Sequence, residues 1–318
     1  MSFLRIAVVG AGSFGRNHLR VIHQSKTASL AGVLDIDPVR TAEAEAAYGC
    51  PSFKSLEELS QHADGAVVAT PTVTHAEIGC RLMDLGLDVL IEKPMAHSLE
   101  AARSLVETAG RTGRILEVGH LERFNPAVTA LSAVVSKPLF FEIHRLSEFS
   151  PRSLDVDVVL DLMIHDLDIV LALTGEGPEE IRAAGISILT PKVDIANVRL
   201  QFPGGCVANL TASRVSTERV RKLRLFQPHE YISLDYTRKD VVRFRVGPNL
   251  AIQFAPLAVS RDEPLRLELE RFFESMITRQ PRGVTGEQGV RALETAFAIL
   301  DKIESHSRRV AKAVEGGA

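Results

Sequence analysis

The sequence contains few cysteines, and their spacing offers no covalent or metal framework. Cys50, Cys80 and Cys206 are the three in 318 residues, and no two have the CxxC spacing. An odd number of widely separated cysteines excludes a disulfide scaffold and a zinc cluster, and is typical of a reducing compartment. The histidines outside the motifs below also form no set with ligand spacing. We therefore predict no metal and expect a cytoplasmic protein.

Long apolar runs and an excess of positive charge are also missing. No stretch approaches the roughly 20 apolar residues that cross a bilayer. The short apolar run at residues 3–9 leads directly into glycines, which predicts a strand rather than a signal peptide. Lys plus Arg number 37 against 40 Asp plus Glu, so there is no basic field to hold nucleic acid. We expect neither a membrane nor a nucleic-acid partner.

The composition, with 45% hydrophobic and 24% charged residues over 318 positions, is typical of a globular protein of two domains. Up to about residue 120, short buried strands alternate with helices, which predicts a parallel sheet with right-handed crossovers. After that point, one long apolar helix near 155–173 is followed by six strands between 181 and 246, and two helices end the chain. We predict an α/β protein: a Rossmann domain over residues 1–121, then an α+β domain over 122–318 with a large, mostly antiparallel sheet.

The first strand ends in a glycine-rich loop, Gly10-Ala11-Gly12-Ser13-Phe14-Gly15, and a helix follows. Glycines at these spacings permit a tight turn, close approach of the backbone to a pyrophosphate, and close packing of helix on strand. The free N–H groups at the start of the helix attract phosphate. Asp35 lies 20 residues beyond Gly15, at the end of the next strand, and can accept hydrogen bonds from the adenosine ribose. This pattern predicts dinucleotide binding.

Asp35 favours NAD over NADP, because a 2′-phosphate would meet its carboxylate. Arg40 is near enough in the sequence to complicate this preference. The simpler interpretation of Arg40 is a solvated helix residue. We therefore expect NAD as the cofactor, with NADP the less favoured alternative.

The long helix carries a polar stripe that needs an explanation. At about 100° per residue, Asp157, Asp161, Asp168 and His165 fall at about 0°, 40°, 20° and 80°, and Asp166 falls near 180°. Buried carboxylates beside a histidine cost free energy unless they are paired, so such a stripe lines a site or joins a network of ion pairs. A network with Arg145 or Arg152 is the structural alternative to catalysis.

The glycine loop, Thr70-Pro71 with His75, Glu92-Lys93-Pro94 and the Asp–His helix occur in an order that resembles the Gfo/Idh/MocA family of nicotinamide-dependent oxidoreductases. The resemblance covers essentially the whole chain. It implies that Lys93 contacts both nicotinamide and substrate, that Asp161 and His165 are the catalytic pair, and that the Lys93–Pro94 peptide is cis. Asp166 and Asp168 are then structural. The cofactor residues it implies are Gly10, Gly12, Ser13, Phe14, Gly15, Asp35, Thr70, Pro71, His75, Glu92 and Lys93.

One departure from the family pattern concerns the pocket wall. Many members have glycines where this chain has Val158, Val159 and Met163. This difference suggests a subgroup with a differently shaped pocket. It weakens any transfer of function from the simple polyol dehydrogenases.

The run Gly119-His120-Leu121-Glu122-Arg123-Phe124-Asn125-Pro126 resembles the branch of the family that acts on UDP-linked amino sugars. Arg123 can bind a phosphate or carboxylate in bidentate fashion. Asn125 can either bind the sugar or cap the helix that begins at Pro126. The substrate-binding residues we expect are Lys93, His120, Arg123, Asn125, Asp161 and His165.

The branch resemblance implies oxidation of UDP-N-acetylglucosamine at C3, giving a 3-keto sugar for an aminotransferase in lipid A synthesis. A dehydrogenase of a free sugar or inositol is the first alternative, and a non-catalytic NAD-binding sensor is the second. The family resemblance also implies a homo-oligomer, a dimer or tetramer, formed through the C-terminal sheet.

Overall fold

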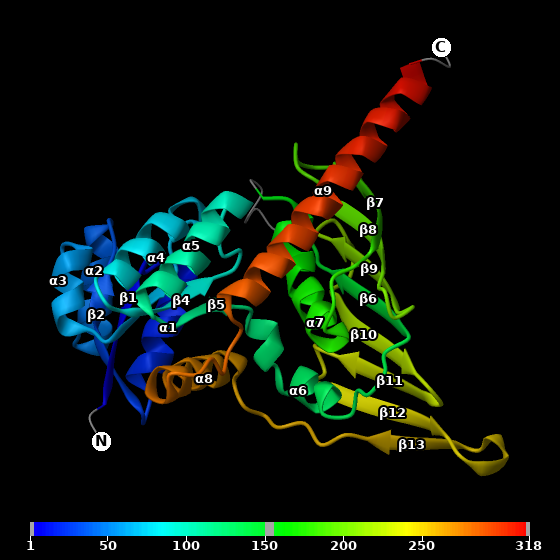
Figure 1. Ribbon diagram of the computed structural model, residues 1–318, viewed down its shortest axis with the longest axis horizontal. Helices are drawn as coiled ribbons and strands as arrows, with labels where there is room; N and C mark the ends of the chain where they lie inside the picture. The colour runs from blue at the N-terminus through cyan, green and yellow to red at the C-terminus, as the bar shows by residue number, and fades with distance from the viewer. Residues whose placement is uncertain (1–2, 150–155, 316–318) are drawn as a thin grey trace. The chain divides into compact units, whose positions relative to one another are not determined.

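The computed structural model describes residues 3–149 and 156–315, and its contacts divide the chain into two compact units (Figure 1). The first unit comprises residues 1–124 and 262–290, and the second comprises 125–261 and 291–318. Residues 262–290 therefore belong with the first unit, although the predicted second domain, 122–318, included them. Among the described residues, no helix is long and apolar enough to cross a membrane.

The first unit is built on a five-stranded parallel sheet in the order β2-β1-β3-β4-β5. Its strands are Leu4–Val9 (β1), Ala28–Leu34 (β2), Gly65–Val68 (β3), Asp88–Glu92 (β4) and Leu116–Gly119 (β5). Its helices are Ser13–His23 (α1), Pro38–Tyr48 (α2), Leu56–His62 (α3), His75–Asp84 (α4), Leu99–Thr112 (α5) and Pro264–Thr278 (α8), with 3₁₀ turns at Thr72–Thr74 and Leu121–Phe124. Parallel pairing brings the carboxyl ends of these strands to one edge, where ligands bind in such sheets. This sheet confirms the predicted Rossmann fold.

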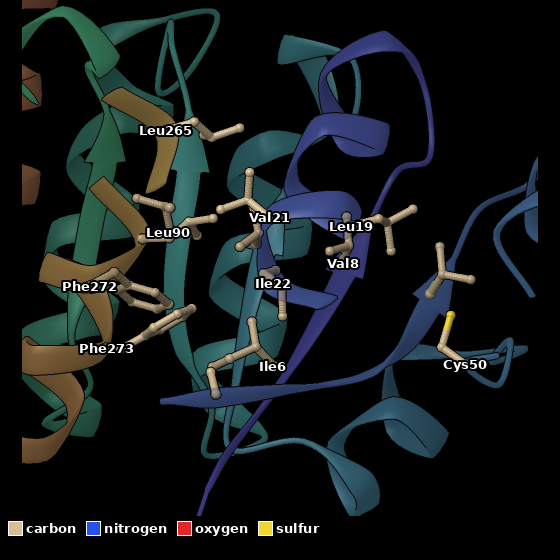
Figure 2. Close-up of a cluster of buried hydrophobic side chains, with 14 of the residues drawn as sticks. Ile6, Val8, Leu19, Val21, Ile22, Cys50, Leu90, Leu265, Phe272 and Phe273 are labelled. Atoms are coloured by element: carbon tan, nitrogen blue, oxygen red, sulfur yellow. The ribbon is translucent and has the colours of Figure 1, made fainter. Parts of the chain in front are cut away.

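Apolar side chains from distant parts of the chain form the core of this unit (Figure 2). Ile22 of α1 and Leu90 of β4 are at most 1% exposed, and Phe272 and Phe273 of α8 are at most 2% exposed. Burying each large apolar side chain contributes roughly 1.5–3 kcal/mol. The apolar face of α8 therefore explains why residues 262–290 return to this unit.

The second unit contains an eight-stranded sheet in the order β13-β12-β11-β10-β6-β9-β8-β7. Its strands are Phe140–Leu146 (β6), Glu180–Ile186 (β7), Ile195–Gln201 (β8), Val207–Ser213 (β9), Val220–Gln227 (β10), Glu230–Asp235 (β11), Asp240–Val246 (β12) and Ile252–Pro256 (β13). All neighbours pair antiparallel except β6 and β9, which pair parallel. The predicted, mostly antiparallel sheet is confirmed; β13 was not predicted.

Helices cover one face of this sheet. They are Pro126–Ser132 (α6), Ile164–Thr174 (α7) and the second-unit part of Gly286–Glu315 (α9) (Figure 1). Burial alternates along β6, where Phe141, Ile143 and Arg145 are buried and the residues between them are partly exposed. Such alternation is typical of a sheet with one covered face. The other face carries Phe140, Glu142 and His144.

The start of the predicted long helix differs from the prediction. Residues 150–155 lie outside the described part of the chain, and Asp157 precedes the helix. Residues Val159–Met163 form a π-helical turn, in which the Ile164 N–H bonds to the Val159 carbonyl, and α7 begins only at Ile164. π-turns are uncommon and frequently occur at functional sites. The regular helix assumed for residues 155–173 is therefore wrong in its first part.

Candidate active site

The glycine loop leaves no room for larger residues at two of its three glycines. Gly10 has φ of +95°, and a Cβ there would lie 2.6 Å from the Ala69 carbonyl oxygen. A Cβ on Gly15 would lie 1.8 Å from the Gly10 carbonyl oxygen. Gly10 therefore permits the tight turn, and Gly15 permits the close packing of α1 on that turn, as the spacing predicted.

Gly12 is different, because the space beside it is open. A Cβ there would meet only the Arg40 guanidinium, at 3.9 Å. Gly12 is the N-cap residue of α1, and no side chain caps that helix. Open space beside an uncapped helix N-terminus fits the pyrophosphate of a dinucleotide. Ser13 and Phe14, also predicted to contact the cofactor, are exposed in the first turn of α1.

Asp35 ties the end of β2 to this loop. Its Oδ2 accepts a hydrogen bond from the Ala11 N–H at 2.6 Å, and its Oδ1 accepts one from the Asp37 N–H at 2.8 Å. Arg40 reaches within 3.8 Å of the Asp35 carboxylate and within 3.3 Å of the Asp37 carboxylate. The carboxylate predicted to meet the ribose is thus also part of the loop's own structure.

The Thr70-Pro71 motif follows β3, and the Glu92-Lys93-Pro94 motif begins at the last residue of β4. Lys93 is half-buried, and the Lys93–Pro94 peptide is cis, as the family resemblance implied. His75 is 1% exposed, and its Nε2 and Nδ1 lie 2.8 and 3.0 Å from the carbonyl oxygens of Thr70 and Pro94. Burial lowers the pKa of His75, opposed by these two carbonyl groups and by the charge of Glu92. The structure therefore places His75 between the two motifs, with its ring nitrogens on backbone carbonyls.

His18 was not identified from the sequence as part of a site. It is fully buried on α1, and its Nε2 lies 2.7 Å from Oε1 of Glu92. Its position three residues after Gly15, on the inward face of α1, was the one sequence feature that indicated a role for His18. That its contact is Glu92, 74 residues away, could not be inferred from this position.

The junction run after β5 divides between the two units. His120, 1% exposed, and the half-buried Arg123 belong to the first unit, whereas Asn125 belongs to the second. The Asn125 Oδ1 accepts a hydrogen bond from the Ala127 N–H at 3.1 Å and caps α6. The structure thus shows the capping role that the sequence left as an alternative.

Asp161 and His165 are half-buried, at the π-turn and the first turn of α7. Asp157 accepts a hydrogen bond from the Val193 N–H at 2.9 Å, which ties the segment before the π-turn to the β7–β8 loop. The Asp157 carboxylate thus binds a backbone N–H group. Asp157 lies before the helix and not on the polar stripe that the sequence predicted for it.

Asp166 lies in the first turn of α7 and is 2% exposed. It forms a buried bidentate ion pair with Arg145, at 2.8 and 2.7 Å, and the Arg145 guanidinium lies 5.1 Å from the centre of the Tyr236 ring. The Arg145 pair is therefore structural and fastens α7 to β6. Asp168 is 1% exposed.

A family model described as an oxidoreductase family with an NAD-binding Rossmann fold matches residues 4–120, and the GFO/IDH/MocA C-terminal domain model matches residues 100–227. The chain is 34% identical over 315 residues to the UDP-N-acetylglucosamine 3-dehydrogenase of Acidithiobacillus ferrooxidans, covering 97% of this chain and 100% of that one.

A solved structure of the Acidithiobacillus ferrooxidans enzyme gives a TM-score of 0.91, over 96% of this chain and 99% of that chain. An inositol 2-dehydrogenase of Rubrobacter xylanophilus is 29% identical over 228 residues, covering 67% of this chain and 65% of that one.

Proposed function

The chain belongs to the Gfo/Idh/MocA family of oxidoreductases, and we propose that it oxidises a secondary hydroxyl of a nucleotide sugar with NAD as hydride acceptor. The observation that carries the choice of substrate is the 34% identity to a UDP-N-acetylglucosamine 3-dehydrogenase over 97% of the chain, which includes the second unit. The proposed reaction converts the C3 hydroxyl of UDP-N-acetylglucosamine to a ketone. An aminotransferase acting on the 3-keto sugar, as in lipid A synthesis, would consume the product.

In the proposed reaction, two side chains act on the sugar hydroxyl and a third supports one of them. His165 removes the hydroxyl proton as general base, and Asp161 orients His165 and offsets the imidazolium charge. Lys93 donates a hydrogen bond to the same oxygen and stabilises its developing negative charge. NAD supplies the hydride acceptor, nicotinamide C4, and the chain's task is alignment of the sugar carbon with it.

NAD is proposed over NADP because of Asp35. Its carboxylate, at the carboxyl end of β2 and bonded to the Ala11 N–H, would face the 2′-phosphate of NADP. Arg40 supports the alternative, since its guanidinium is within 3.8 Å of that carboxylate. The charge of Asp35 therefore decides the preference in this proposal.

Inositol is the second substrate candidate, favoured by the 29% identity to an inositol 2-dehydrogenase. That similarity covers 67% of the chain, against 97% for the UDP-sugar enzyme. Turnover with UDP-N-acetylglucosamine compared with myo-inositol and free N-acetylglucosamine, under the same NAD concentration, separates the two candidates.

The catalytic assignment is tested with Lys93→Ala and His165→Ala. Loss of a general base or of an alkoxide-stabilising donor costs about 10²–10⁴-fold in turnover. We expect both variants to lose turnover by such factors while calorimetry still detects NAD binding. Near-normal turnover in a folded variant would remove that residue from the mechanism.

We also propose that two copies pair through the uncovered face of the second-unit sheet. Phe140, Phe226, Tyr231, Phe244 and Phe254 lie opposite one another on five adjacent strands, with successive ring centres 4.9–5.8 Å apart. Phe226 is 38% exposed and Phe254 63% exposed. An aromatic row of this size at the surface supports an interface.

A further inference from the structure

The turn that carries Lys93 is held from both sides by buried histidines. On the preceding side, His18 contacts Glu92, and on the following side His75 contacts the carbonyl of Pro94. The two histidines come from different helices, α1 and α4, and are 0% and 1% exposed. Neither histidine is close to Lys93 in the sequence.

The contact between His18 and Glu92 links this turn to the glycine loop. His18 lies on α1, the helix that begins in the glycine loop, and its Nε2 is 2.7 Å from Glu92 Oε1. A carboxylate only accepts hydrogen bonds, so the imidazole N–H donates to it, in a charge-assisted bond. In the described part of the chain, His18 Nδ1 has no hydrogen-bond partner. The hydrogen bond to Glu92 therefore explains why a polar histidine is found at this buried position.

Glu92 is itself confined on its other side. A Cβ added to Gly119 would lie 3.2 Å from Glu92 Oε2, so β5 passes close to the carboxylate. The side chain is 13% exposed. Glu92 is therefore held between α1 and β5, directly before Lys93.

The contact of His75 links the other side of the turn to β3. Its ring bridges the carbonyl oxygens of Thr70 and Pro94. The Ala69 carbonyl, next to Thr70, is the group that a Cβ on Gly10 would meet. His75 therefore connects Pro94 to the end of β3, and the end of β3 packs against Gly10 of the glycine loop.

We propose that His18 and His75 are positioning residues that fix Lys93 relative to the glycine loop. This proposal rests on the proposed function, in which Lys93 contacts the reacting oxygen. A lysine side chain is long and flexible, so the position of its ammonium depends on how firmly its backbone is held. A displacement of about 1 Å at a reacting group can cost about 100-fold in rate.

The test combines substitutions that break each contact with one that preserves it. His18→Leu fills the space but removes the donor, His18→Gln retains an N–H donor near the position of Nε2, and His75→Leu removes both ring contacts. His62→Gln is the control, because His62 is exposed on the same unit and stacks on Phe53. Calorimetry with NAD and thermal unfolding are measured for all four.

We expect kcat to fall about 10- to 100-fold in His18→Leu and His75→Leu, with the Kd for NAD within about 3-fold of the parent chain. His18→Gln should recover most of kcat, and His62→Gln should match the parent. Parent-like kcat in a folded His18→Leu and a folded His75→Leu would overturn the proposal, as would a loss confined to NAD affinity. Where a leucine variant does not fold, His18→Met and His75→Met, which also remove the ring N–H and N atoms but keep an apolar side chain, decide by the same criteria.

A readout that needs no turnover separates this proposal from the proposed function. The rate of Lys93 acylation by a limiting lysine reagent is measured by mass spectrometry against that of the exposed Lys54. A changed Lys93 to Lys54 ratio in the His18 and His75 variants, but not in His62→Gln, supports positioning even if no sugar is oxidised. An unchanged ratio overturns it, whatever the parent chain's activity.

Discussion

Gly12 and Gly15 lie three residues apart in one loop, yet their surroundings give them different tasks. Gly15 has no space for a Cβ, because the Gly10 carbonyl oxygen would lie 1.8 Å from it. Gly12 has open space beside the start of α1. Gly15 is therefore required by the fold, whereas the open space at Gly12 is where we propose that the pyrophosphate binds.

This contrast predicts opposite effects of alanine. Gly12→Ala should leave the free energy of unfolding within about 1 kcal/mol of the parent and weaken NAD binding at least about 10-fold, because its methyl group occupies the pyrophosphate position. Gly15→Ala should lower stability itself. Calorimetric NAD titration and urea unfolding measure the two effects. Parent-like NAD affinity in Gly12→Ala would contradict the placement of the pyrophosphate.

Asp35 gives a second prediction for a single residue. Asp35→Ser removes the charge that opposes a 2′-phosphate while Arg40 remains, so the ratio of kcat/KM for NADP to that for NAD should rise about 10-fold or more. Asp37→Asn is the control, since Asp37 caps α2 and lies 3.3 Å from Arg40. An unchanged ratio in Asp35→Ser would show that Asp35 does not determine the preference.

At the scale of elements, the segment before α7 is fastened by backbone contacts rather than by helical structure. Asp157 binds the Val193 N–H, and the Val158 N–H bonds to the Val193 carbonyl at 2.9 Å. The neighbouring Asp194 is fully buried and accepts hydrogen bonds from the N–H groups of Ile188, Leu189 and Thr190. The β7–β8 loop therefore supports the π-turn that carries Asp161.

Asp194 makes this loop dependent on pH. Burial acts to raise the pKa of Asp194, but the N–H groups and the Thr190 hydroxyl outweigh it and lower the pKa to about 2. The ordinary value is about 3.9, so the stabilisation is present above that pH and is lost as pH falls through about 2.

Asp194→Asn should therefore lower the free energy of unfolding at pH 7 by about 2 kcal/mol. The difference in free energy of unfolding between Asp194→Asn and the parent should shrink as pH falls from about 4 to about 2. Urea unfolding at several pH values measures this. Asp240→Asn, at a more exposed pair with Arg238, should stay within about 0.5 kcal/mol. A difference that is constant with pH would contradict the role of the charge.

Local patterns explain which elements could be predicted. The glycine loop, Asp35 and the strands of both sheets other than β13 follow from short-range residue patterns, and the structure has them near the expected residues. The π-turn at Val159–Met163 does not follow from such a pattern, because the apolar residues of this segment predict a helix but do not mark where one extra residue enters a turn. The His18–Glu92 contact also depends on packing between segments 74 residues apart. Such contacts become visible only when the chain is folded.

At the scale of the whole molecule, the chain order does not match the two units. The second domain of the prediction ran to residue 318, whereas α8 packs into the core of the first unit. An amphipathic helix shows in its sequence that it has an apolar face, but not which surface that face covers. The sheet face opposite α6, α7 and α9 likewise carries an aromatic row that is partly exposed in the described part of the chain, and its strand pattern does not specify a partner.

The proposed pairing predicts the effect of charge in the aromatic row. Phe226→Glu combined with Phe254→Glu should shift the chain from an oligomer to a monomer in sedimentation velocity, because a carboxylate in an apolar contact is costly to bury. Ile277→Glu, on the 64% exposed Ile277 of α8, is the control and should not change the mass. A monomeric parent chain, or an unchanged oligomer in the double variant, would contradict the proposed interface.

The most direct test of the proposed function is reduced-nicotinamide absorbance with NAD and UDP-N-acetylglucosamine. Oxidation of a hydroxyl is unfavourable at neutral pH, so an aminotransferase with its amine donor removes the keto product. We predict an absorbance rise that requires NAD, the UDP-sugar and His165 together, and that is absent with myo-inositol. No rise in a parent chain shown to bind NAD, or an equal rise in His165→Ala, would contradict the account.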